Sequence, residues 1–318
     1  MLTFLIRRSI GAVLVCIAVT FIVFLIFIVV PGGDPAVRIA GKNATSQNII
    51  NIRHSWGFDK PFYDQYWNLM KKMFWDHNLV SYTSGQNVLT QIVQGMPATF
   101  SLTIGAGIIW LFFGVLVGVI SAVTAGRLSD RVITVLALIG ISMPVFWLGI
   151  ITRYYLAEGG VVSWFPDGEY VGITASPAQW FGHMILPWLV LAVLFIGFYG
   201  RVLRGNILDT INEDFVRTAK SKGLTPRRIL VKHVLRTSLI PIITLFGLDF
   251  AAVLGGGAIL TETVFDLHGV GQYAELSINN FDLPPIMGVT MYGAFFIVVF
   301  SMLVDLFYAY LDPRIRPT

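Results

Sequence analysis

Ionisable side chains inside long apolar segments are the residues most able to do chemistry in this sequence. Burying a charge among apolar neighbours is costly, so such residues usually have a partner or a function. The four that stand in such segments are Arg153, Asp249, Glu262 and Asp305. Arg153 and Glu262 stand near segment ends, where a long side chain can reach the membrane interface, and we expect the same of Asp305.

Asp249 is harder to explain, because it lies about eleven residues from Ser238 and therefore near the middle of its segment. We predict that Asp249 faces a translocation path or pairs with a partner subunit. A hydrogen bond to a neighbouring helix of the same chain is the alternative. Pro144, which interrupts another apolar segment, and Glu262 are the other candidate residues for such a path.

Enzyme chemistry is not indicated by any motif. Gly41-Lys42-Asn43 lacks the rest of a phosphate-binding loop, and neither a nucleophile–base arrangement nor a pair of catalytic carboxylates follows from residue spacing. The five histidines lack metal-ligand spacing, and the single cysteine, Cys16, excludes an intrachain disulfide. We therefore expect no catalytic residue, cofactor or metal in this chain. If ATP drives its activity, another polypeptide must hydrolyse it.

The composition is that of a protein that crosses the membrane several times. Of 318 residues, 55% are hydrophobic and only 13% are charged, against about 25% charged residues in typical soluble domains. A soluble protein of this size could not bury so much apolar surface. We therefore predict an all-α polytopic membrane protein.

Six apolar segments are predicted to be membrane-spanning helices. Gly114 and Gly118 form a pair of small residues that lets two helices approach closely. Pro144, Pro241 and the glycines at 255–257 mark the places where helices are expected to bend. The first segment is 22 residues long, enough for the roughly 20 that a span needs, and we read it as a retained helix. The segments are 9–30, 100–125, 132–157, 183–203, 238–261 and 286–310.

The distribution of basic residues predicts the orientation. With both termini in the cytoplasm, the four inside segments hold 15 of the 22 Lys and Arg residues. The outside loops 158–182 and 263–285 contain no Lys or Arg and three acidic residues each. This distribution satisfies the positive-inside rule at every crossing.

Residues 31–98 differ in kind from the apolar segments, with mixed charge, polar clusters and many aromatic residues. We expect a small external domain of short helices, following residues 1–30 and preceding a transmembrane core over 99–318. Docking of a solute-binding protein is one interpretation of its surface. A structural cap at the membrane interface, where aromatic residues are common, is the other.

A basic insert separates the fourth and fifth apolar segments. Between Asp209 and Arg236 it holds seven Lys or Arg residues against three acids, a net charge of +4 that equals the charge of the whole chain. Glu213 and Asp214 suit a helix start, Gly223 suits a left-handed residue after its end, and Thr225-Pro226 suits a second helix start. The insert is thus predicted to be two short helices with a sharp turn. An ordinary basic cytoplasmic loop is the simpler alternative.

This insert, residues 205–237, resembles the EAA loop of permeases from ATP-binding-cassette (ABC) importers, in the form found in the dipeptide, oligopeptide and nickel group. The Glu-Ala-Ala and Gly positions of the motif are Arg217, Thr218, Ala219 and Gly223, so the glutamate is replaced, and the later proline is deferred to Pro241. The other matches are Gly57-Phe58-Asp59-x-Pro61, Gln65-Tyr66, Pro97-Ala98-Thr99, Thr261-Glu262, Phe265, His268-Gly269-Val270-Gly271 and Leu311-Asp312-Pro313-Arg314-Ile315-Arg316.

The resemblance implies a type I importer fold in the inner membrane of a bacterium. It implies a permease that forms half of a translocation pathway for dipeptides or oligopeptides. Its partners would be a second permease, two cytoplasmic ATPases that bind ATP and Mg²⁺, an external solute-binding protein and membrane lipid.

By the same resemblance, the first helix of the insert is a coupling helix that lies in a groove of one ATPase. Phe215 would be its apolar anchor, Arg217 and Lys222 its polar contacts, and Gly223 its turn. The predicted coupling residues are Asp214, Phe215, Arg217, Thr218, Ala219, Lys222, Gly223, Arg227 and Arg228.

Other functions stay open at this point. The same architecture could import nickel complexes or glutathione, because the residues do not specify the substrate. An ion-coupled secondary transporter with Asp249 as carrier is a competing class, although no internal repeat is evident. A membrane-embedded enzyme lacks a catalytic constellation, and nucleic-acid binding by the basic insert is disfavoured because a single short insert is available.

Overall fold

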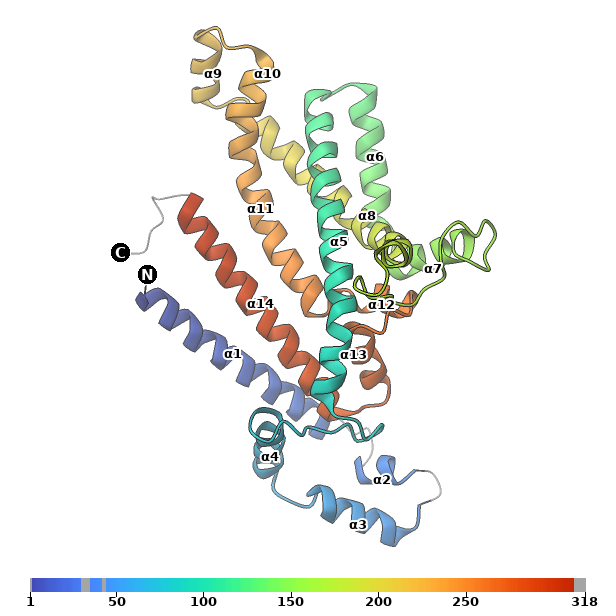
Figure 1. Ribbon diagram of the computed structural model, residues 1–318. Coiled ribbons are helices and arrows are strands. Elements are labelled where there is room, and N and C mark those ends of the chain that lie inside the picture. Colours follow the sequence, from blue (N-terminus) through green and yellow to red (C-terminus); the bar gives the residue numbers. More distant parts are fainter. Residues whose placement is uncertain (1, 30–34, 42–43, 312–318) are drawn as a thin grey trace.

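The computed structural model describes residues 2–29, 35–41 and 44–311. In these residues the chain is helical, with two isolated β-bridges, Val80–Asn87 and Ala157–Phe165, which agrees with the all-α prediction. Figure 1 shows long helices gathered into a body with short helices at both ends. The elements are α1 Leu2–Val29, α2 Pro35–Ala40, α3 Ser46–Trp56, α4 Phe62–Phe74, α5 Val88–Val123, α6 Leu128–Ser142, α7 Val145–Leu156, α8 Pro177–Thr210, α9 Asp214–Ser221, α10 Pro226–Ile229, the π-helical turn η1 Leu230–Val234, α11 Leu235–Ala252, the π-helical turn η2 Val253–Gly257, α12 Ile259–Val264, α13 Val270–Asn279 and α14 Leu283–Leu311.

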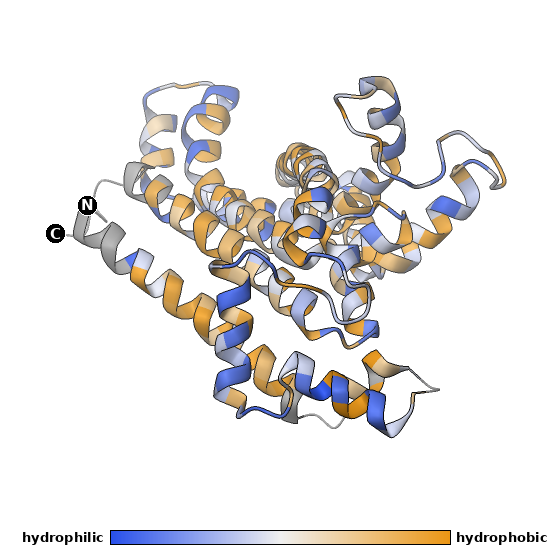
Figure 2. Cartoon of the chain, turned by 60° about the horizontal axis from the view of Figure 1, so that its bottom comes forward, coloured by the Kyte–Doolittle hydropathy of each residue, from blue (hydrophilic) through white to orange (hydrophobic). Residues whose placement is uncertain are grey.

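Five stretches of the described chain are long and apolar enough to cross a membrane, and a bent pair, α6 and α7, gives a sixth if it is one span. Figure 2 shows hydrophobic residues along the long helices and hydrophilic residues concentrated on short helices and turns. Each of the six predicted segments overlaps one of these stretches or the bent pair, but α5 begins well before the predicted start at 100, and α8 extends beyond both ends of the predicted 183–203. The five stretches are Arg8–Phe27, Val88–Val123, Pro177–Thr210, Pro226–Gly257 and Leu283–Leu306.

The third predicted segment is not one kinked helix but two helices meeting at 98°. Met143 is extended, with φ −78° and ψ 126°, and Pro144 stands at the N-cap of α7. A proline disfavours the helical conformation in the residue before it, which explains why α6 ends there. The sequence located the interruption, and the structure shows that it is a complete break.

The stretch predicted as an external domain, residues 31–98, contains the short helices α2, α3 and α4, but α5 already begins at Val88, with Asn87 as its N-cap. Helix α3 buries none of its side chains, whereas α4 buries Leu69. Buried Asp282 holds the loop before α5, where its carboxylate accepts hydrogen bonds from Ser81 Oγ and from the backbone N–H groups of Tyr82 and Thr83. The stretch is therefore tied to the body at its C-terminal part, and a packed external domain over its whole length stays a prediction.

Helices α5 and α8 share the most extensive contact of the body, and glycines permit it. A Cβ added at Gly114 would lie 2.7 Å from Cβ of Tyr199, and one at Gly118 would lie 2.9 Å from the carbonyl oxygen of Gly200. A Cβ on Gly200 would in turn lie 2.7 Å from Val117. The predicted role of Gly114 and Gly118 in close helix approach is confirmed.

The expected bend of the fifth segment lies at its glycines. Pro241 is inside the continuous helix α11, whereas Gly256 has a left-handed φ of 135° where η2 ends the run. Here α14 crosses closely, since a Cβ on Gly255 would lie 3.1 Å from the carbonyl oxygen of Gly293. Helices α1 and α14 run side by side along one edge of the body (Figure 1).

Gly118→Ala is expected to destabilise the protein, because the new methyl group would force α5 away from α8. Overpacking of this kind costs about 1–3 kcal/mol. Gly205→Ala is the matched control on α8, because nothing lies within 4 Å of its added Cβ. Thermal unfolding in detergent should show a lower midpoint for Gly118→Ala only. Equal midpoints for the two variants would contradict the packing role of Gly118.

Candidate functional site

A helical elbow, residues 214–234, stands at one end of the body and carries all nine predicted coupling residues (Figure 1). Its turn has the geometry expected from the sequence. Gly223 is left-handed, with φ +75°, and its N–H donates to Lys220 O at 2.9 Å, while Leu224 N–H donates to Ala219 O at 3.3 Å. These two bonds form a Schellman motif. Thr225 then occupies the N-cap of α10, although its side chain makes no capping bond.

The elbow has a buried inner face and an exposed outer face. Val216 and Ala219 of α9 pack inward with Ile229 of α10, which fixes the direction in which α9 presents its other residues. Ala219 is 6% exposed, so it supports the elbow from within and is not placed for direct contact. Phe215, in contrast, is 42% exposed, although the same helix has a buried face. The other predicted coupling residues on the exposed face are Asp214, Arg217, Thr218, Lys222, Gly223, Arg227 and Arg228.

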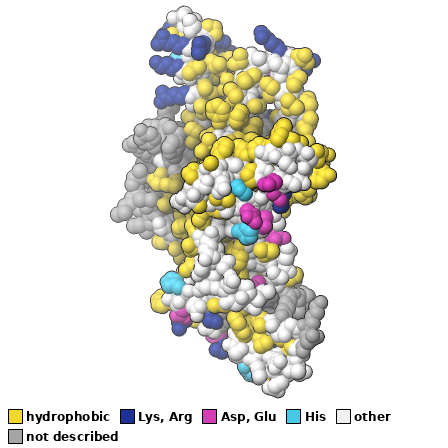
Figure 3. All heavy atoms as spheres, turned by 45° about the vertical axis from the view of Figure 1, so that its right-hand side comes forward, with side chains coloured by type: hydrophobic (Ala, Val, Ile, Leu, Met, Phe, Trp, Pro, Cys, Tyr) yellow, Lys and Arg dark blue, Asp and Glu magenta, His cyan; other side chains and the backbone are white. Residues whose placement is uncertain are grey.

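Positive charge gathers at the elbow end of the molecule (Figure 3). Arg217 Nη1 lies 3.4 Å from Asp214 Oδ1, and both side chains are largely exposed, so this pair contributes little stability. Among the described residues, the remaining Lys and Arg side chains of the elbow form no ion pair within the chain. Their charge is therefore available to a partner.

Hydrogen bonds join α8 and α11, the helices on either side of the elbow. Ser238, 2% exposed at the start of α11, donates from Oγ to Asn206 O at 3.2 Å and lies 3.1 Å from Thr210 Oγ1. Asn206 Nδ2 donates back to Ser238 O at 3.4 Å. The last turn of α8 and the first turns of α11 thus hold one another at the base of the elbow.

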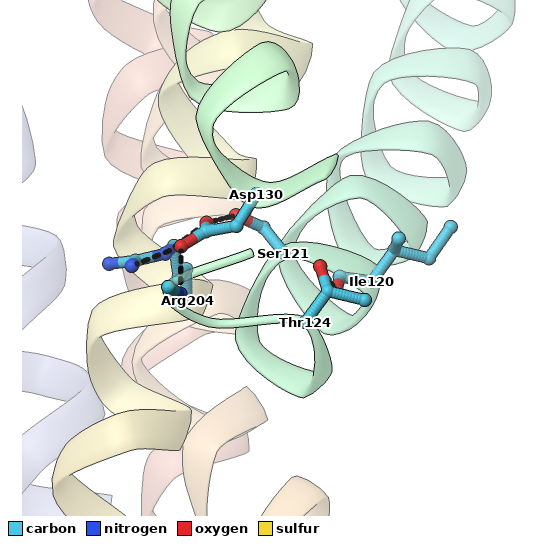
Figure 4. A network of polar contacts seen from close by, with 6 residues as sticks. Ile120, Ser121, Thr124, Asp130 and Arg204 are labelled. Atoms are coloured by element: carbon cyan, nitrogen blue, oxygen red, sulfur yellow. Dashed lines mark hydrogen bonds and ion pairs between the residues drawn. The ribbon is translucent and has the colours of Figure 1, made fainter. Parts of the chain in front are cut away.

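A second polar cluster joins α8 to the turn between α5 and α6 (Figure 4). Arg204 on α8 makes two bonds to Asp130, Nε to Oδ1 and Nη2 to Oδ2, each 2.8 Å long. Asp130 also accepts from Ser121 Oγ and from Gly126 N–H. The Asp130 side chain is 6% exposed, and its carboxylate accepts four hydrogen bonds.

Asp249 accepts a hydrogen bond from Tyr199 OH at 2.7 Å, so a neighbouring helix of the same chain supplies a partner. This is the contact that was the alternative to a place on a translocation path. Asp249 is nevertheless only partly buried, and both functions stay compatible with its position. Pro144 is exposed at the break between α6 and α7. A path role for either residue stays a prediction.

Glu262 lies at the centre of a polar network at the end of the body opposite the elbow. It is 0% exposed, and its Oε1 accepts from Thr99 Oγ1 at 2.8 Å while Oε2 accepts from Gln272 N–H at 2.9 Å. Thr99 Oγ1 also accepts from Val270 N–H at 2.9 Å. A Cβ on Gly269 would collide with the Glu262 carboxylate, so only glycine fits there. The network links α5, α12 and the N-terminus of α13.

The expectation that Glu262 reaches the membrane interface is wrong, because the surrounding donors hold its carboxylate inside the protein. Burial raises its pKa to about 7, against the opposing effect of the bonds from Thr99, Gln272 and Gly271. A place on a translocation path would require this network to open.

Arg153 and Asp305, the other two ionisable residues of apolar segments, also have partners. Arg153 binds Asp167 through two nitrogens, with Nη2 and Oδ2 3.0 Å apart, and donates to Val264 O at 2.6 Å. Its guanidinium lowers the pKa of Asp167 from the usual value. Asp305 Oδ2 lies 2.5 Å from Arg8 Nη2, and this ion pair joins α14 to α1.

Several of these bonded positions were not found from the sequence. Arg204 entered only in the count of basic residues and Asp130 was not singled out, although two opposite charges at the ends of apolar segments could have indicated a pair. Pro97-Ala98-Thr99, Thr261-Glu262 and His268-Gly269-Val270-Gly271 were noted separately, and the structure brings all three into the Glu262 network. In the described residues, no group of three or more His, Cys, Asp or Glu side chains is placed to hold a metal ion.

Comparison with known protein families gives two matches that together cover most of the chain. Residues 114–317 match the family described as binding-protein-dependent transport system inner membrane component. Residues 1–103 match the family described as the N-terminal part of such membrane components. The boundary between the two falls inside α5.

Similar proteins cover the chain from end to end. A peptide ABC transporter permease of Sinorhizobium fredii is 36% identical, over 98% of this chain and 99% of the relative. The D,D-dipeptide transport system permease DdpB of Escherichia coli is 36% identical, over 97% and 96%. The glutathione transport system permease GsiC of Escherichia coli is 33% identical, over 99% and 99%. Among solved structures, an inward-facing form of the MetNI methionine ABC transporter has a TM-score of 0.55 at 16% identity, over 70% of this chain and 97% of that chain, which supports the type I importer fold.

Stability should depend on pH through Glu262. Because burial raises the pKa of Glu262 from 4.5 to about 7, the folded protein holds this proton where the unfolded chain releases it. The free energy of unfolding therefore falls as the pH rises through this range, by at most about 3 kcal/mol. Glu262→Gln cannot titrate and should lose this dependence. Thermal unfolding between pH 5 and pH 8, with wild type and variant side by side, measures it.

Glu275→Gln on α13 is the matched control, because this carboxylate bonds Asn279 on its own helix. It should follow the wild-type pH profile. If Glu262→Gln follows that profile as well, the Glu262 carboxylate does not titrate in this range and burial does not raise its pKa as proposed.

Proposed function

We propose that this chain forms half of a translocation pathway for peptides. The premise is that it belongs to the family of binding-protein-dependent transport system inner membrane components and is a permease subunit of an ABC importer. As a transport subunit it has no catalytic role, and ATP hydrolysis takes place in a separate subunit. ATP and Mg²⁺ bind in those partner subunits.

The names of the relatives support a peptide substrate. Relatives at 32–36% identity over nearly the whole chain are named for peptides or dipeptides. GsiC, at 33%, is named for glutathione, which is itself a short peptide derivative. Dipeptides and oligopeptides are therefore the first substrates to test, followed by glutathione and nickel complexes.

The elbow couples transport to the ATPase, and its construction supports this role. The Schellman turn at Gly223 and the inward packing of Val216 and Ala219 give it a fixed shape. That shape leaves Phe215 exposed on a segment rich in Lys and Arg. An exposed aromatic residue beside cations is typical of the central contacts of protein interfaces. Phe215 would fill an apolar pocket of the ATPase, while Arg217 and Lys222 bind acidic groups at its rim.

Closure of the ATPases on binding ATP would move the elbow, and α8 and α11 would follow because they form its base. The path would then change from inward-facing to outward-facing by rigid-body movement of helices. Asp249 and Pro144 are the candidate residues along this path. Glu262 would act at the opposite end, where its network keeps α5 and α13 together.

The assembly would contain a second permease, two ATPases and a solute-binding protein in the bacterial inner membrane. An apolar groove of about 1220 Å³ between α1, α4, α5 and α14 supports a permease partner, because a single chain leaves this surface uncovered. The concentration of Lys and Arg at the elbow end supports a cytoplasmic location for that end, with both termini on the same side.

Phe215→Ala is expected to release the ATPase, because removing a central aromatic contact costs about 2 kcal/mol or more. Val231→Ala is the matched control, since Val231 is an exposed apolar residue of the elbow outside α9, at 58% exposure. Co-purification of the ATPases with each variant of the assembled importer measures the loss. Undiminished recovery with Phe215→Ala would exclude α9 as the main contact.

Peptide uptake by the reconstituted importer should require ATP, both permeases and the solute-binding protein. The ligand that co-purifies with that binding protein identifies the substrate. Transport by this chain alone in liposomes, without ATP, would contradict the proposed function and favour an ion-coupled carrier.

A further inference from the structure

The ion pair of Asp130 and Arg204 is more costly than a simple structural contact requires. The Asp130 side chain is 6% exposed, whereas that of Arg204 keeps 32% of its surface exposed. Taking a charge out of water is costly, and apolar residues of similar volume often stabilise a protein as well or better. Asp130 is nonetheless held by four bonds, two from Arg204 and one each from Ser121 and Gly126. A bidentate ion pair holds its two side chains in one relative orientation in addition to contributing energy. The segments that the pair joins therefore indicate which relative orientation it holds.

The pair lies where three segments meet: the end of α5, the turn that leads into α6, and α8 just before the elbow (Figure 4). Arg204 precedes the last residue of α8, Thr210, by six positions. On the other side of α8, Asn206 and Thr210 bind Ser238 of α11. The elbow is thus fastened to the α5–α6 turn by one cluster and to α11 by another.

The contact with α14 is of a different kind. Among the described side chains, no hydrogen bond or ion pair joins α14 to α5, α6 or α8. Helix α14 packs on the elbow-bearing run through apolar and backbone contacts, at Gly247 with Val304, at Phe250 with Phe300 and at the Gly255–Gly293 crossing next to the break at Gly256. Its polar attachment at the elbow end, Asp305 with Arg8, leads to α1 instead. The polar bonds between the two parts lie at the end away from the elbow, where Asp282, the residue before α14, accepts hydrogen bonds from the loop before α5. Movement of α14 relative to α8 at the elbow end would therefore break no polar bond described here.

We propose that the Asp130–Arg204 pair is a rigid joint through which movement of the elbow reaches the α5–α6 hairpin. Arg204 and Asp130 are positioning residues in this role, because they act through the helices they join and touch neither substrate nor nucleotide. With the joint intact, the elbow, α8, α5 and α6 move as one body, and α14 with α1 moves relative to it. The proposal rests on the proposed function, in which an ATPase moves the elbow.

Distances within the assembled importer test the joint directly. In a Cys16→Ser background, spin labels at Val231→Cys on the elbow and Leu128→Cys on α6 report the distance across the joint, since Val231 is exposed and outside the proposed ATPase contact. Labels at Val231→Cys and Leu303→Cys on α14 report the distance between the two parts. With and without ATP, the first distance should stay constant and the second should change. A first distance that changes as much as the second overturns the proposal.

Variants then test what the joint does for transport. Asp130→Asn and Arg204→Gln should broaden the first distance and lower the peptide transported per ATP by about 5- to 150-fold, the usual range of coupling between sites. Arg204→Lys keeps the charge but loses the two-pronged bond, so it should fall between these variants and wild type. Unchanged transport per ATP in Asp130→Asn, with the importer assembled, overturns the proposal.

Asp167→Asn is the matched control, because it breaks another bidentate pair, that with Arg153, at the end of the body away from the elbow. It should leave transport per ATP at the wild-type value, and an equal fall would mean that any ion pair has this effect. If Asp130→Asn does not assemble, the distances in the unmodified joint still decide. ATPase co-purification with Phe215→Ala separates failure of the joint from failure of the proposed function, since it depends on the elbow contact alone.

Discussion

The close approach of α5 and α8 is the contact on which the other parts of this structure depend. Between helices in lipid the hydrophobic effect gives little attraction, so association relies on close packing and polar bonds. Gly114, Gly118 and Gly200 allow the two backbones to meet. At this separation, side chains near the ends of the two helices come within bonding distance of partners that are far away in the sequence. The two main polar clusters both include α5, Thr99 toward its start and Ser121 near its end.

These two clusters differ in their chemistry. Near the elbow, Arg204 and Asp130 fix α8 to the α5–α6 turn with charged, bidentate bonds that hold a single geometry. At the opposite end, Thr99 and Glu262 join α5 to the segment around α13. There a single carboxylate receives neutral donors, and its pKa of about 7 means that its charge can change. The first cluster suits the transmission of movement, and the second suits an attachment that opens.

The two faces of the short helix α9 have different tasks: one packs the elbow against the body, and the other is available to a partner protein. Val216 and Ala219 are buried and give the helix its place, whereas Phe215 and the cations are exposed and leave it a surface for another protein. A loop that only satisfied the positive-inside rule would need neither the buried face nor the Schellman turn at Gly223. This division explains how a subunit without ATP chemistry of its own can respond to a motor.

Local sequence determined where the apolar helices lie, where some of them break or are capped, and the membrane class, because apolar runs, glycines and prolines act over a few residues. Gly223 and Thr225 were placed correctly for this reason, and Pro144 was recognised as an interruption. The depth of Glu262 and the pairing of Arg204 could not be derived, because the partners lie 163 and 74 positions away. Only helix packing decides which distant side chains meet. Sequence therefore specified where the chain is polar, and tertiary structure decided which of those polar groups are buried and bonded to one another.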